Sequence, residues 1–165
     1  MPKSPQSRKL RFTKDRVAIL ETNVDDVSGE VVSRAIERLM NEGALDVITT
    51  PFAGKKGRTG HTIRITATPS SVNKMAEIMF EETGTLGMKT IEYDRLMVPR
   101  TTHVIPFKLK SYHGTVSVKV ANNENSVRIK PEFSQAREIS ERTGVSVREV
   151  IDLITESTRK RLNLR

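Results

Sequence analysis

The sequence predicts an α+β protein with a ferredoxin-like β-α-β-β-α-β core, to which a β-hairpin and C-terminal helices are added. Three observations support this fold class. A helix-spaced apolar pattern follows Ser28, a strictly alternating pattern covers 61–67, and a second helical pattern follows Pro69. With short apolar segments over 17–22, 45–50 and 88–93 as three further strands, these elements have the order of four antiparallel strands with both helices on one face.

The N-terminal part of the core is predicted from its turn and cap residues. Residues 1–15 are polar and basic, and they are expected to form a flexible lead-in to a strand over 17–22. Ser28 is expected to cap the following helix, and Gly43 to end it. The apolar face of that helix is expected to comprise Val31, Val32, Ala35, Ile36, Leu39 and Met40.

The rest of the core is predicted from its apolar segments and from its proline and glycine residues. A strand over 45–50 is expected to stop at Pro51, and a glycine-containing loop over 53–60 leads into the alternating strand. A helix beginning near Pro69 and a strand over 88–93 complete a ferredoxin-like domain assigned to 16–98.

Residues 99–165 are expected to form a β-hairpin and a helical subdomain. The two hairpin strands are expected to join through Tyr112, His113 and Gly114, and a short extended segment follows them. Gly144 separates two predicted helices, and Ser146 with Glu149 has the spacing of a capping box. The predicted segments are 102–110, 115–120, 126–130, 134–142 and 146–161.

Composition narrows the class of partner. The 165-residue chain carries a formal net charge of +8, which points to a polyanionic partner, either a nucleic acid or a phosphorylated small molecule. Five Phe, two Tyr and no Trp provide few platforms for stacking bases, which argues against a nucleic acid. Cysteine is absent, which removes disulfides and thiolate ligands, and no apolar run approaches the ~20 residues of a membrane span. A cytoplasmic location is the default expectation.

An acidic turn is the first candidate site. Asp25 and Asp26 lie between a strand and a helix, with Glu21 and Glu30 close by in the sequence. Carboxylate oxygens suit magnesium or manganese, which take their remaining ligands from phosphate and water. The alternative is that both aspartates only favour the positive end of the helix.

A basic loop is the second candidate. Lys55, Lys56 and Arg58 alternate with glycines, so that cationic side chains and backbone N–H groups could both approach a triphosphate. The loop lacks the P-loop pattern, and a solvated hairpin tip is the alternative. The acidic turn and this loop need not be adjacent in one chain, and a single site formed by both could require two subunits. The three histidines, His61, His103 and His113, are scattered and are read as surface or strand residues.

Longer motifs resemble the C-terminal half of the LarC nickel-insertion family. The most specific motif is 21–30, Glu-Thr-Asn-Val-Asp-Asp-Val-Ser-Gly-Glu, and the resemblance covers roughly 17–155. The other matching segments are 43–47, Thr50-Pro51, 55–58, 82–88, 95–100, 112–114, Val118-Lys119 and 131–133.

The resemblance implies a function. That family inserts nickel into a pyridinium bisthiocarboxylate mononucleotide to complete a nickel-pincer cofactor. The resemblance implies that the C-terminal half holds CTP with magnesium or manganese, and that nickel is a substrate. Metal-side candidates are then Asp25, Asp26 and Glu132, and phosphate-side candidates are Lys55, Lys56, Arg58, Arg95 and Lys119. Glu132, which follows Pro131, is equally placed to cap a helix.

Two departures limit what the resemblance implies. The family loop usually reads Met-Lys-Lys-Asn-Arg-Pro-Gly, whereas 54–60 keeps the cations and lacks the proline. The N-terminal half of the family is also absent, so either a separate chain is expected to supply it, or this chain is a stand-alone relative with another substrate. Without Cys, and with scattered His, the chain has few of the ligands that suit nickel. It is therefore expected to bind metal–CTP without inserting nickel alone. A homo-oligomer is expected because the domain is small and its site is divided between two segments. An RNA-binding regulatory module and a purely structural oligomerisation domain are the alternatives.

Overall fold

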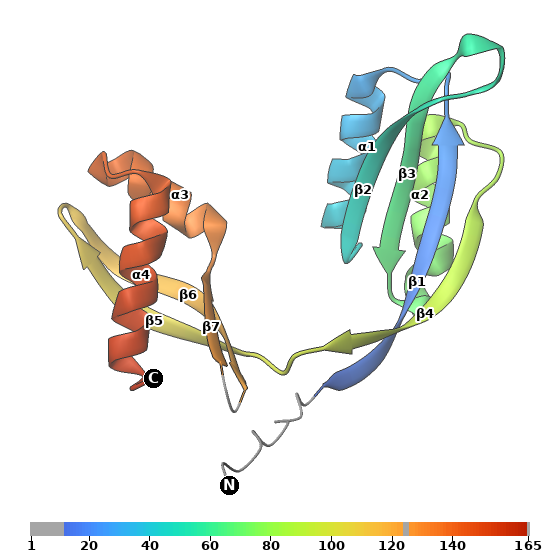
Figure 1. Cartoon of the computed structure of the whole chain (residues 1–165). Coiled ribbons are helices and arrows are strands. Elements are labelled where there is room, and N and C mark those ends of the chain that lie inside the picture. Colours follow the sequence, from blue (N-terminus) through green and yellow to red (C-terminus); the bar gives the residue numbers. More distant parts are fainter. Residues whose placement is uncertain (1–11, 124–125, 165) are drawn as a thin grey trace, which may run out of the picture. The chain divides into compact units, whose positions relative to one another are not determined.

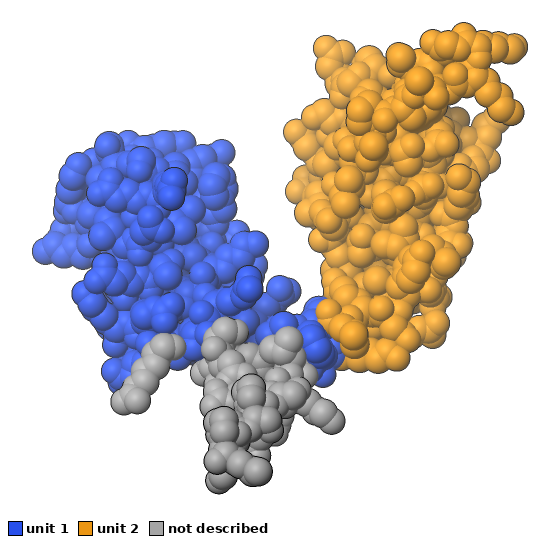
Figure 2. Space-filling view, in the orientation of Figure 1, with its two compact units in different colours: residues 1–13, 97–165 blue, residues 14–96 orange. Residues whose placement is uncertain are grey.

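A computed structural model of the chain describes residues 12–123 and 126–164. The chain divides into two compact units, Lys14–Leu96 and a unit that contains the residues from Met97 onward (Figure 2). Most of the predicted flexible lead-in, 1–11, lies outside the described residues. Within those described ranges, no helix combines the length and apolar character needed to cross a bilayer.

The first unit has the predicted ferredoxin-like topology. Its sheet has the strand order β2-β3-β1-β4, and α1 and α2 cover one face of it (Figure 1). The elements are β1 (Thr13–Val24), α1 (Gly29–Asn41), β2 (Asp46–Ala53), β3 (Thr59–Ala67), α2 (Val72–Thr83) and β4 (Lys89–Met97). Two one-turn 3-10 helices, η1 (Lys55–Gly57) and η2 (Pro69–Ser71), precede β3 and α2. The predicted fold class is confirmed.

The helix α1 begins and packs much as its sequence predicts. The Ser28 hydroxyl accepts a hydrogen bond from the Val31 N–H, as an N-cap does. Val32, Ala35 and Leu39 are buried in one cluster with Leu20, Ile63 and Ile65 of the sheet and with Met75 and Met79 of α2. Met40, expected on the buried face, is exposed instead.

Two strand boundaries differ from the prediction. β1 begins at Thr13, so residues assigned to the flexible lead-in belong to the sheet, where Asp15 pairs with Arg95 of β4. β2 continues through Pro51 to Ala53 instead of stopping at the proline. A strand at the edge of a sheet tolerates proline, because an edge strand leaves one row of backbone groups unpaired.

The second unit is a three-stranded sheet with two helices packed on it. The strand order is β5-β6-β7, and both neighbouring pairs are antiparallel. Its elements are β5 (Thr101–Leu109), β6 (Tyr112–Asn123), β7 (Ser126–Pro131), α3 (Phe133–Thr143) and α4 (Val147–Arg161). Gly144 ends α3 in the left-handed region at φ 66°, and the Ser146 hydroxyl accepts from the Glu149 N–H at the start of α4. The predicted glycine break and helix cap are confirmed.

The β5–β6 turn lies earlier than predicted. Leu109 pairs with Tyr112, so the turn consists of Lys110 and Ser111, and Tyr112, His113 and Gly114 belong to β6. Lys110 has φ 47°, a conformation that glycine or asparagine signals more clearly than lysine. Gly114 serves another purpose, because a Cβ there would lie 2.8 Å from the Tyr112 hydroxyl oxygen.

Candidate functional site

The acidic turn and the basic loop lie at the same end of the first unit's sheet. β1 and β2 each pair antiparallel with β3, which lies between them, so they run in the same direction. The turn after β1 and the loop after β2 therefore both follow strand ends at one edge. The expectation that these segments need not be adjacent was wrong, since one chain brings them together.

A direct contact joins the two segments. Arg58 Nη1 lies 3.5 Å from Asp25 Oδ2, a long ion pair between side chains that are 62% and 38% exposed. Such a solvated contact contributes little to stability. Both groups therefore remain accessible, and an incoming phosphate or metal ion could exchange for this contact at small cost.

The basic loop has a defined backbone conformation. Gly54 N–H donates to Arg58 O at 2.6 Å, and Arg58 N–H donates to Lys55 O at 3.3 Å. Lys56 and Gly57 both have positive φ, 58° and 72°. No carboxylate among the described residues pairs with the exposed side chains of Lys55 or Lys56, which leaves two cations available to an anion.

The carboxylates near this site are fewer than the sequence suggested. Asp25 and Asp26 are exposed, and Ser28 already caps α1, so neither aspartate is needed for the cap. Glu21 instead faces Arg64, which donates to it at 2.7 Å and 3.1 Å. These hydrogen bonds, with the nearby charge of Lys89, lower the pKa of Glu21.

The described part of the chain contains no preformed metal cage. Nowhere in residues 12–123 and 126–164 do three or more His, Cys, Asp or Glu side chains come close enough to hold an ion. An ion beside Asp25 and Asp26 would need phosphate and water for its other ligands. Magnesium and manganese accept that arrangement.

Arg95, a predicted phosphate ligand, is engaged elsewhere in the first unit. Its guanidinium donates to both carboxylate oxygens of Asp15, at 3.0 Å and 2.6 Å. These bonds lower the pKa of Asp15 and raise that of Arg95. Asp15 is near the start of β1 and Asp25 follows its end, about 30 Å apart along an extended strand. Arg95 is therefore not part of the group formed by Asp25 and the basic loop.

Lys119 and Glu132, the other two predicted residues, lie in the second unit and pair with each other. Lys119 Nζ is 3.4 Å from Glu132 Oε2 across β6 and the start of α3. Glu132 occupies the N-cap position of α3, but its side chain makes no capping hydrogen bond. The carboxylate is therefore held by a lysine instead of by the helix end.

The open face of the first unit's sheet bears on the RNA-binding alternative. A shallow depression of about 820 Å³ lies over β1, β3 and β4, and Tyr93 is the one aromatic residue among those lining it. RNA readers of this topology stack bases on several aromatic side chains of the sheet. The lining residues around Tyr93, which include Val17, Ile19 and Arg64, do not form such a platform.

The family model described as "Nickel insertion protein" matches residues 5–151 of this chain. This chain belongs to the nickel insertion protein family. A relative from Methanococcoides burtonii, whose name is that of the family, is 38% identical over 143 residues, which are 85% of this chain and 36% of the relative. The "Pyridinium-3,5-bisthiocarboxylic acid mononucleotide nickel insertion protein" of Clostridium acetobutylicum is 33% identical over 80% of this chain and 31% of its own length. The chain thus spans about a third of the length of these curated relatives.

Solved structures agree with this assignment. The structure described as "LarC2, the C-terminal domain of a cyclometallase involved in the synthesis of the NPN cofactor of lactate racemase, apo form" matches with a TM-score of 0.77 and 25% identity, over 88% of this chain and 99% of that one. A protein from Methanopyrus kandleri matches with a TM-score of 0.65 and 30% identity, over 87% of this chain and 88% of that one. The expected relationship to the C-terminal part of the LarC family is confirmed.

Proposed function

We propose that this member of the nickel insertion protein family is the CTP- and divalent-metal-binding C-terminal component of a nickel insertase. The observation that carries the proposal is the 3.5 Å contact between Arg58 and Asp25, which joins a cationic loop to a carboxylate turn in one chain. A metal–triphosphate complex needs this combination, since its phosphates attract cations and its metal attracts carboxylates.

Each group has a role in this proposal. Lys55, Lys56 and Arg58 bind the phosphate oxygens, and Arg58 exchanges Asp25 for phosphate when the nucleotide enters. Asp25 and Asp26 bind magnesium or manganese directly or through water. The geometry of the described residues in the acidic turn and basic loop does not distinguish cytosine from another base, so the preference for CTP rests on the family relationship.

Nickel and the pyridinium dithiocarboxylate mononucleotide are the substrates of the proposed insertase. The chain has no Cys and three His, so its oxygen-rich turn suits a hard ion better than nickel. We propose that an N-terminal half, expected as a separate chain, supplies the nickel ligands. Co-purification of that half with this chain would test the partnership.

The oligomeric state needs its own measurement. A homo-oligomer was expected partly because the site seemed divided between subunits, and the Asp25–Arg58 contact within one chain removes that reason. The expectation stays a prediction, which sedimentation velocity with and without CTP can measure.

Isothermal titration calorimetry with CTP, ATP, GTP and UTP, each with and without Mn²⁺, tests the nucleotide proposal. CTP should bind at least tenfold more tightly than the others, and more tightly with the metal. Arg58→Ala should weaken this binding roughly 10- to 100-fold, as expected for a lost charge-assisted hydrogen bond. Arg34→Ala, which removes an exposed cation of α1, is the matched control and should leave it unchanged. Equal or absent binding of CTP would overturn the proposal, whereas a salt-sensitive shift with RNA alone would favour the RNA-binding alternative.

A further inference from the structure

A third segment, 84–88, lies at the same end of the first unit's sheet as the acidic turn and the basic loop. The strand β4 follows it and runs antiparallel to β1, since Lys89 meets Glu21 near one end of the strand pair and Asp94 meets Lys14 near the other. Because β1 lies between β3 and β4, the segment is on the opposite side of the acidic turn from the basic loop (Figure 1).

Hydrogen bonds to β1 hold this segment in place. The Thr22 hydroxyl donates to the Gly87 carbonyl oxygen at 2.9 Å and lies 2.7 Å from the Thr85 hydroxyl. Thr22 is buried, and it lies three residues before Asp25, which is about 10 Å along a strand. One strand therefore fixes both the segment and the acidic turn.

The tip of the segment presents an apolar side chain and two unpaired donors. Leu86 is 100% exposed, whereas no other large apolar side chain among the described residues exceeds 65%. The N–H groups of Leu86 and Gly87 donate no hydrogen bond to another residue that the structure describes. A single exposed leucine is common on protein surfaces, so the position of Leu86 beside the acidic turn is what distinguishes it.

The distances suit a nucleotide that lies along this end of the sheet. Neighbouring strands are about 4.8 Å apart, so the segment before β4 lies roughly 10 Å from the start of β3, where the basic loop ends. A nucleotide whose phosphates meet Arg58 and whose metal meets Asp25 therefore reaches Leu86 with its nucleoside.

We propose that segment 84–88 binds the nucleoside and selects its base, with Leu86 as the residue that covers the ring. This inference rests on the proposed function and adds residues to its site. The free N–H groups of Leu86 and Gly87 donate to the O2 and N3 acceptors of cytosine. Uracil carries an N–H at N3, so a fixed donor there is left unpaired by UTP, and an unpaired polar group opposes binding.

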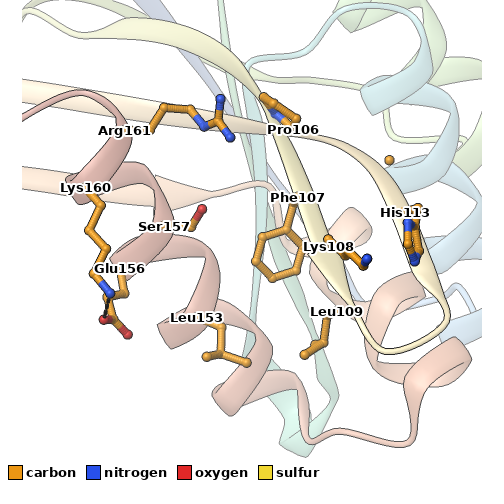
Figure 3. A pocket seen from close by; sticks show the side chains of 11 residues that line it. Pro106, Phe107, Lys108, Leu109, His113, Leu153, Glu156, Ser157, Lys160 and Arg161 are labelled. Atoms are coloured by element: carbon orange, nitrogen blue, oxygen red, sulfur yellow. Dashed lines mark ion pairs between the residues drawn. The ribbon is translucent and has the colours of Figure 1, made fainter.

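A groove in the second unit does not compete for this role. It lies between β5 and α4, where Phe107 and Leu153 project into it (Figure 3). Lys108 is on the opposite face of the sheet from Phe107, since side chains alternate along a strand, and Lys160 is held by Glu156 at 2.6 Å. The groove therefore offers an apolar surface without the convergent cations that a triphosphate needs.

Calorimetry on the full chain with Mn²⁺ and CTP, UTP or inorganic tripolyphosphate separates base recognition from phosphate recognition. Leu86→Ser should weaken CTP binding roughly tenfold, because the apolar surface that covers the ring is lost. Its affinity for tripolyphosphate should stay within twofold of the wild type, whereas Lys55→Ala/Lys56→Ala should weaken binding of both. Leu45→Ser removes another exposed leucine, at the opposite end of the sheet, and should bind all three probes like the wild type.

Thr85→Val tests the hydrogen bonds that hold the segment. The substitution keeps the size of the side chain and removes the hydroxyl that lies 2.7 Å from Thr22. It should reduce the preference for CTP over UTP while the affinity for tripolyphosphate stays within twofold of the wild type. The thermal unfolding midpoint of each variant shows whether the fold is retained.

The inference is overturned if Leu86→Ser and Thr85→Val keep the wild-type affinity and preference for CTP, or if they lose CTP and tripolyphosphate to the same extent. A wild type that prefers CTP leaves the proposed function intact in both cases. Absence of a CTP preference in the wild type would overturn the proposed function together with this inference. A changed sedimentation coefficient of Leu86→Ser, with unchanged CTP affinity, would instead assign Leu86 to a contact between copies of the chain.

Discussion

Gly60 packs directly against the main chain of Asp25. A Cβ built on Gly60 would lie 2.9 Å from Asp25 Cα and would overlap the carbonyl oxygen of Val24. The first residues of β3 therefore lie against the turn that follows β1. This close approach, more than the long Arg58–Asp25 ion pair, holds the acidic turn beside the basic loop.

Gly60→Ala is expected to displace the acidic turn. Relief of the overlap requires movement of backbone, so the free energy of unfolding should fall by about 1–3 kcal/mol. CTP affinity in the presence of Mn²⁺ should fall as well, because Asp25 moves relative to Arg58. Chemical denaturation and calorimetry measure the two effects. Gly29→Ala is the control, since a Cβ at Gly29 meets nothing within 4 Å and stability should not decrease.

Asp25→Asn and Arg58→Ala should separate binding from stability. Both side chains are exposed, so each substitution should change the free energy of unfolding by no more than about 0.5 kcal/mol. Asp25→Asn should reduce the gain in CTP affinity that Mn²⁺ provides, and Arg58→Ala should reduce CTP affinity with or without metal. A large loss of stability with unchanged nucleotide affinity would identify the contact as structural.

Local signals in the sequence were sufficient for much of the fold. Ser28 and Ser146 mark the starts of α1 and α4 because a cap depends on one side chain and the next turn of backbone. Gly43 and Gly144 follow the last turns of α1 and α3, where each adopts a positive φ. Alternation over β3 also suffices, since Ile63, Ile65 and Ala67 all face the core.

The predicted and observed strand boundaries differ where contacts between residues far apart in the sequence determine the structure, or where a turn lacks its usual residue. β1 extends to Thr13 because it pairs with β4, some 80 residues further along the chain, where Lys14 and Arg16 meet Asp94 and Glu92. Nothing in the polar, basic composition of that segment signals such pairs. Lys110 takes positive φ in the β5–β6 turn without the glycine that would have indicated it.

Part of the candidate site could be predicted from the sequence and part could not. The ferredoxin-like order places the strand after α1 parallel to the first strand, so the adjacency of Asp25 and Arg58 follows from the topology that was itself predicted. The pairing of Arg95 with Asp15 did not follow, because Asp15 was assigned to a flexible segment.

Arg95→Ala should act on stability and not on the nucleotide. Asp15 and Arg95 join β1 and β4 by two hydrogen bonds, so the thermal unfolding midpoint should fall modestly when the guanidinium is lost. CTP affinity should stay within twofold of the wild type. Arg16→Ala, which removes the neighbouring Arg16–Glu92 pair, should behave in the same way. A loss of CTP affinity as large as that of Arg58→Ala would instead return Arg95 to the nucleotide site.

The ion pairs of Glu21 should make stability depend on acid pH. Hydrogen bonds from Arg64, with the charge of Lys89, lower the pKa of Glu21 below its usual 4.5. A carboxyl whose folded-state pKa is lowered stabilises the fold fully above the unfolded pKa, and that contribution is lost as pH falls through the folded value. Wild type should therefore be more stable than Glu21→Gln at pH 7, and the difference should shrink progressively below pH 4.5. Arg64 is 54% exposed, so the difference should be modest, and 1 M NaCl should reduce it. Urea denaturation at several pH values, with the exposed Glu37→Gln as the control, measures the effect; a difference that persists unchanged to pH 3 would show that Glu21 acts through packing instead of charge.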